Sequence, residues 1–223
     1  MGSLDTLESM AHVRRPAGWE SVLPRRLFVR IPQVRWWTVS GFATLPAVLL
    51  WCWRDATEWA VYDRGRIAGG ELWRLITGHW THWTSQHLGW DVLAFAVLLP
   101  LCWIASRRRT CWTLASACVL IPAVIFAALP QLVEYRGLSG LDSALFVMLA
   151  TTLLRREWNA RAWPSTAVFA IALVGFAVKL GFELSTGQAV FVESNGFVPV
   201  PLAHIVGGLC GVAAALKGDR CET

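Results

Sequence analysis

Apolar residues gather in six long runs along the chain, and more polar stretches of different lengths separate them. The runs cover about residues 36–53, 87–105, 111–131, 137–154, 163–184 and 200–216. An α-helix rises 1.5 Å per residue, so about 18 residues cover ~27 Å, which is close to the hydrocarbon thickness of a bilayer. The pattern therefore predicts an all-α, polytopic membrane protein with six transmembrane helices.

Composition supports a lipid bilayer as the surroundings of the chain. Of the 223 residues, 55% are hydrophobic and 16% are charged, whereas soluble domains carry about 25% charged residues. Many of the 14 tryptophans stand near the ends of the apolar runs, as is typical of side chains at a membrane interface. The net charge is +5, but the arginines flank apolar runs instead of sharing one polar face. We therefore expect no nucleic-acid partner.

Basic residues predict the orientation of the runs. They concentrate before the first run, after the second, after the fourth and after the sixth: Arg14, Arg15, Arg25, Arg26, Arg30, Arg35, Arg107, Arg108, Arg109, Arg155, Arg156, Arg161, Lys217 and Arg220. Since positive loops remain in the cytoplasm, both termini should be cytoplasmic. The second, fourth and sixth runs then all cross from outside to inside. We expect a basic cytoplasmic tail (1–35), a six-span domain (36–216) and a short cytoplasmic tail (217–223).

The longest connection, residues 54–86, should lie on the outer side. It mixes charges with interfacial aromatic residues, as in 72–76 and 79–83. Such a segment is expected to form short helices and turns at the membrane surface.

Three polar side chains begin the runs that cross in the same direction, so they should share one depth. These are His87, Ser139 and His204. A serine, a histidine that accepts its proton and a second histidine that donates to an oxyanion could meet in one outward-facing cavity. Taken singly, each could be structural, because serine and glycine are common in membrane helices. Their shared depth favours a site.

Small residues predict that the fourth and sixth runs pack closely. Ala203, Gly207 and Gly211 recur every four residues, and Gly140 and Ala144 do the same on the fourth run. This spacing lets two membrane helices approach each other, as a hydrogen bond between Ser139 and His204 requires.

Three motifs resemble those of the rhomboid intramembrane serine proteases. Residues 137–140 (GLSG) resemble the family's GxSG motif, and residues 203–211 resemble its AHxxGxxxG motif. The outer connection is similar to the family's W-R, T, H, H series at Trp73, Arg74, Thr77, His82 and His87. The resemblance covers about residues 36–216 and implies a rhomboid-like bundle of six helices.

Within the family, the chain looks most like the rhombosortase branch. Its compact size, the GHWTHW stretch at 78–83 and the KLGFE stretch at 179–183 carry this resemblance. The branch implies a bacterial inner (plasma) membrane, an active site open to the extracytoplasmic side and transmembrane substrates with Gly-Gly-containing C-terminal sorting tails. Lys179 and Glu183 are four residues apart, so we interpret them as a structural pair, with substrate contact as the alternative.

The resemblance also implies a mechanism. Ser139 would be the nucleophile and His204 its base, with Gly137 and Gly140 beside the serine. The Ser139 N–H and the His87 side chain would stabilise the oxyanion. The family implies no acidic third member, no cofactor and no metal.

Two positions depart from the family pattern. Asp91 stands where rhomboids usually carry asparagine, and an ionised carboxylate would oppose a forming oxyanion. We hypothesise that Asp91 is either protonated or hydrogen-bonded to His87. Ser143 stands where many rhomboids have an aromatic residue, which makes it a rival nucleophile, and Asp142 beside it has no assigned role.

Three alternatives remain open. A catalytically inactive rhomboid-like membrane chaperone or binding protein would share the fold. A metal or haem protein could use His79, His82, His87 and His204, although the HExxH motif is absent. A transporter would be expected to show inverted halves, which the sequence lacks. The resemblance implies a class of substrate but names no individual protein, and the sequence indicates no oligomeric state.

Overall fold

The structure, a computed structural model, describes residues 36–188 and 200–217. The six longest helices follow the six apolar runs: α1 (Trp36–Cys52), α5 (Ser85–Ala105), α6 (Arg107–Ala128), α7 (Ser139–Asn159), α8 (Trp163–Thr186) and α9 (Pro201–Leu216). The predicted all-α fold class is confirmed for these residues. The predicted tails at 1–35 and 218–223 and most of the connection 185–199 lie outside the described residues.

Three of these helices, α5, α6 and α8, are long and apolar enough to cross a membrane. Helix α9 and the segment Thr38–Cys52 of α1 are apolar but shorter. Helix α7 has 21 residues, but it carries Asp142 near its start and Arg155, Arg156 and Glu157 near its end. The predicted six spans are thus not confirmed, because α1 and α9 are short and α7 carries charged residues near both ends.

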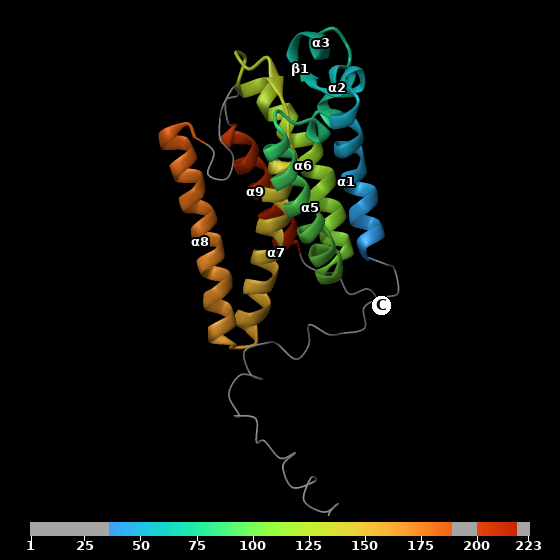
Figure 1. Ribbon diagram of the computed structural model, residues 1–223. Coiled ribbons are helices and arrows are strands. Elements are labelled where there is room, and N and C mark those ends of the chain that lie inside the picture. The colour runs from blue at the N-terminus through green and yellow to red at the C-terminus, as the bar shows by residue number, and fades with distance from the viewer. Residues whose placement is uncertain (1–35, 189–199, 218–223) are drawn as a thin grey trace, which may run out of the picture. The chain divides into compact units, whose positions relative to one another are not determined.

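Helix α7 packs against α5, α6, α8 and α9, which lie around it in Figure 1. Its buried apolar residues include Leu141, Ala144, Leu145 and Met148. Helix α8 differs, since only 6% of its most apolar stretch is buried. Most of α8 therefore faces away from the core, as a helix in contact with lipid would.

The connection 54–86 folds into short elements, as predicted. These are α2 (Arg54–Ala60), β1 (Tyr62–Asp63), α3 (Arg64–Ala68), α4 (Arg74–Thr77) and a 3₁₀ turn (Gly78–Trp80). Strand β1 pairs antiparallel with β2 (Glu134–Tyr135), with Tyr62 opposite Tyr135. Because β2 lies just before α7, this pairing ties the connection to the start of that helix.

Arg74 and Thr77 hold the connection together. The Arg74 side chain is fully buried; its guanidinium donates to the carbonyl oxygens of Glu58 (2.8 Å) and Val61 (2.9 Å) and to the Glu71 carboxylate (2.7 Å). Thr77 Oγ1 donates to the Ala60 carbonyl oxygen at 2.6 Å. These motif residues therefore have a structural role, since they satisfy carbonyl groups at and beyond the end of α2.

The two helices α7 and α9 touch backbone to backbone. A Cβ atom added at Gly207 would collide with the carbonyl oxygen of Gly140, and one added at Gly211 would collide with that of Ala144. A Cβ at Gly140 would in turn lie 3.3 Å from the Ala203 carbonyl oxygen. The small residues singled out in the sequence thus face one another, and no side chain separates the two backbones at these points.

We expect Gly207→Ala to destabilise the protein by about 1–3 kcal/mol, the usual effect of overpacking. Gly181→Ala is the matched control, because a Cβ at that exposed α8 position meets nothing within 4 Å and alanine favours a helix. Thermal unfolding in detergent should give a lower midpoint for the first variant only. Equal midpoints would show that the backbone contact is not tight.

Candidate active site

Ser139 and His204 meet at the contact between α7 and α9. Ser139 is the first residue of α7, and His204 lies in the first turn of α9. Ser139 Oγ is 3.1 Å from His204 Nε2. His204 is buried and Ser139 is partly exposed. This is hydrogen-bonding distance between a hydroxyl and an imidazole that could remove its proton.

The other nitrogen of the His204 ring contacts a carboxylate. Nδ1 lies 2.8 Å from Glu183 Oε2, and Lys179 Nζ donates to Glu183 Oε1 at 2.7 Å. Both come from the last turns of α8, which ends where α7 and α9 begin (Figure 1). The expected Lys179–Glu183 pair is present. The contact between Glu183 and His204 was not predicted, although a glutamate within an apolar run was the available signal.

Asp91 lies at the centre of a second cluster, between α5 and the start of α7. Its Oδ2 accepts the backbone N–H groups of Leu138 (2.8 Å) and Ser139 (3.2 Å). The Nε2 atoms of His82 and His87 each lie 3.2 Å from the same oxygen. Of the two states hypothesised for Asp91, the close approach to His87 is the one that this geometry fits.

The two expected oxyanion donors therefore face Asp91. The Ser139 N–H donates to its carboxylate, and His87 Nε2 lies beside it. The free N–H groups at the start of a long helix favour a nearby negative charge. In this structure the Asp91 carboxylate supplies that charge, in the position that a substrate oxyanion would need. A substrate oxyanion could use these N–H groups only after Asp91 moves off them.

Gly137 makes this cluster possible. Its φ of 122° lies in the region that favours glycine. A Cβ atom there would approach His87 Nε2 to 2.7 Å and Asp91 Oδ2 to 3.1 Å. Only a glycine therefore fits between the start of α7 and the two α5 side chains.

The polar neighbours of Ser139 do not compete for His204. Ser143 Oγ donates to the Ser139 carbonyl oxygen at 2.8 Å, within α7. Asp142 is buried, and its Oδ1 has no hydrogen-bond partner among the described residues. Nothing in the structure explains Asp142.

The histidines considered as metal ligands have other partners. His79 Nε2 lies 3.2 Å from the Cys118 carbonyl oxygen, and burial lowers its pKa to about 4, so it is neutral at pH 7. His82 and His87 approach Asp91, whereas His204 lies between Ser139 and Glu183. Within 36–188 and 200–217, no three His, Cys, Asp or Glu side chains form a metal-binding group.

Compared with known protein families and with curated proteins, the chain has no match.

We expect Asp91→Ala to lower stability by about 1–3 kcal/mol, because two backbone N–H groups and two imidazoles at this site lose their acceptor. Asp91→Asn keeps an oxygen there and should cost less. Unfolding midpoints in detergent would compare the two variants with the wild type. If alanine were tolerated as well as asparagine, the carboxylate would not be the acceptor that holds the start of α7.

Proposed function

We propose that the chain is a rhomboid-type intramembrane serine endopeptidase that cleaves membrane-anchored proteins. The observation that carries the proposal is the 3.1 Å distance from Ser139 Oγ to His204 Nε2, at the adjoining ends of two helices. The motifs around both residues, GLSG at 137–140 and AHIVG at 203–207, support it.

Each half of the reaction passes one proton through His204. Ser139 Oγ attacks the carbonyl carbon of the scissile peptide bond while His204 Nε2 takes the hydroxyl proton. As the C–N bond breaks, His204 returns that proton to the leaving amine. Water then attacks the acyl-enzyme ester and gives a proton to His204, which passes it to Ser139 Oγ as the ester bond breaks and the new carboxyl end leaves.

Charge on the carbonyl oxygen must be stabilised in the same place. The Ser139 N–H and the His87 ring are the donors within the described residues that the proposal assigns to it, once the Asp91 side chain turns away. One such donor typically contributes about 3–4 kcal/mol to the transition state. Before substrate binds, the Asp91 carboxylate thus occupies the donors that the oxyanion would use.

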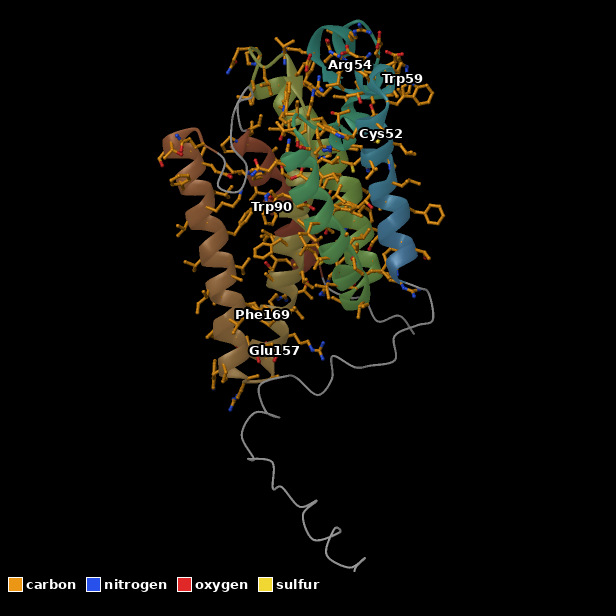
Figure 2. All side chains as sticks on the ribbon, viewed as in Figure 1. Cys52, Arg54, Trp59, Trp90, Glu157 and Phe169 are labelled. Carbon is orange, nitrogen blue, oxygen red and sulfur yellow. The ribbon has the colours of Figure 1, made fainter. Side chains whose placement is uncertain are left out.

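The membrane placement is part of the proposal. With α5, α6 and α8 as candidate spans, α1, α7 and α9 would complete a rhomboid-like bundle of six. Both termini would be cytoplasmic and the site would open to the extracytoplasmic side of a bacterial inner membrane. In Figure 2, Glu157 lies at the opposite end of the bundle from Arg54 and Trp59, so the basic end of α7 (Arg155 and Arg156) lies away from Ser139, as this orientation requires.

The substrate class follows from the rhombosortase resemblance. The GHWTHW stretch at 78–83 and the KLGFE stretch at 179–183 favour substrates that end in a transmembrane tail with a Gly-Gly motif. Removal of such C-terminal sorting tails is the specific activity that we propose.

A rhomboid-like membrane chaperone or binding protein without catalysis is the second candidate. The position of Asp91 favours it, because a carboxylate already occupies the N–H groups that an oxyanion would need.

Replacement of the nucleophile separates these candidates. We expect Ser139→Ala to abolish both covalent labelling by a fluorophosphonate and cleavage of a co-expressed protein with a Gly-Gly-type membrane tail. Ser143→Ala is the matched control, one helical turn away, and should retain most of both activities. Equal labelling of the wild type and Ser139→Ala would refute the protease assignment; absence of any labelling would favour the binding protein.

The contact between Asp91 and the Ser139 N–H leads to a prediction about the labelling rate. Asp91→Asn removes a negative charge next to the forming oxyanion, so its labelling rate should rise by about tenfold, which corresponds to about 1.4 kcal/mol. The labelling time course of the purified variant would measure this. A rate below that of the wild type would instead assign the carboxylate a supporting role in the reaction.

A further inference from the structure

The His204 ring has partners on both nitrogens, and the identity of the second partner determines what the first can do. A neutral imidazole carries one proton, on Nδ1 or on Nε2. Only the form with its proton on Nδ1 leaves Nε2 free to accept a proton from Ser139 Oγ. The group that faces Nδ1 therefore controls whether His204 can act as a base.

Two groups of opposite charge compete for Nδ1. Glu183 Oε2 lies at 2.8 Å and, while ionised, can only accept a hydrogen bond from it. Lys179 Nζ lies at 3.3 Å and, as an ammonium, can only donate a hydrogen bond to it. Glu183 is the nearer of the two, and its other oxygen accepts from Lys179. The arrangement thus favours Nδ1–H and directs the ammonium away from the ring.

The burial of Glu183 is unusual for its helix. Only Thr166 and Glu183 are buried in the 24 residues of α8, and the Glu183 side chain is 1% exposed. Its burial therefore comes from this one contact region instead of from the general packing of α8. A buried carboxylate is costly unless it is paired, and Glu183 is paired on both oxygens.

We propose that Glu183 is a positioning residue that holds His204 in the Nδ1–H form, so that α7, α8 and α9 together supply a Ser139–His204–Glu183 triad. The inference rests on the proposed function and deepens it. When His204 takes the proton of Ser139, the same carboxylate faces the imidazolium that forms. Lys179 anchors the other carboxylate oxygen and thereby fixes its direction.

The competition between Lys179 and Glu183 predicts a specific interaction between two substitutions. In Glu183→Gln the carboxylate charge is lost and Lys179 is free to donate to Nδ1, which moves the ring proton to Nε2. The variant should label with fluorophosphonate at least ~100-fold more slowly than the wild type. Adding Lys179→Met removes the competing donor, so the double variant should label faster than Glu183→Gln alone.

Nitrogen-15 NMR of the imidazole provides a readout that a purely structural role would not change. The full-length protein in detergent, labelled at histidine and assigned with His204→Ala, should show His204 protonated on Nδ1. Glu183→Gln should show the Nε2–H form, and the double variant should shift back toward Nδ1–H. Glu157→Gln is the control, because this carboxylate is also buried but lies at the far end of α7 (Figure 2).

Two results would overturn the inference. One is a wild-type protein in which His204 is protonated on Nε2. This measurement does not depend on the folding of any variant. The other is a Glu183→Gln protein that labels at the wild-type rate with an unchanged ring proton. In that second case Ser139-dependent labelling would remain and the protease assignment would stand. A wild type that never labels would instead refute the assignment, while the position of the ring proton would still test Glu183.

Discussion

The backbone contact between α7 and α9 positions everything else at the candidate site. Gly207 and Gly211 face the carbonyl oxygens of Gly140 and Ala144 with no room for a Cβ atom. Because the helices lie this close, a short serine side chain at the start of one reaches the ring of His204 in the first turn of the other. A methyl group added at Gly207 or Gly211 would collide with the facing backbone, so the two helices would have to shift at this contact.

Two buried carboxylates from different helices contact the two members of the Ser139–His204 pair. Glu183 comes from α8 and faces the ring nitrogen that does not contact Ser139. Asp91 comes from α5 and accepts the N–H groups at the start of α7. In the proposed protease, the first carboxylate prepares the base, whereas the second occupies the donors that an oxyanion needs. In that proposal, an aligned nucleophile lies beside an occupied donor site, and movement of Asp91 is the step that substrate binding must bring about.

Features of the fold that follow from a local sequence pattern could be predicted from the sequence. Contacts between side chains on different helices could not. Run length predicted the six long helices, and small-residue spacing pointed to the faces that meet between α7 and α9. Helix direction placed Ser139 near His204. Glu183 was assigned only to Lys179, because a spacing of four shows a partner on the same helix but not one on α9. Asp91 was not predicted to accept the Ser139 N–H, because the two residues are far apart in sequence and the turn at Gly137 brings them together.

The most direct test of the central claim is to identify the atom that reacts. The purified wild-type protein would be treated with a fluorophosphonate, digested and mapped by mass spectrometry. We expect a single phosphonyl adduct, on the peptide that contains Ser139, and none after prior denaturation. An adduct on another residue, or a Ser139 peptide that stays unmodified while the protein still cleaves a membrane-anchored substrate, would contradict it.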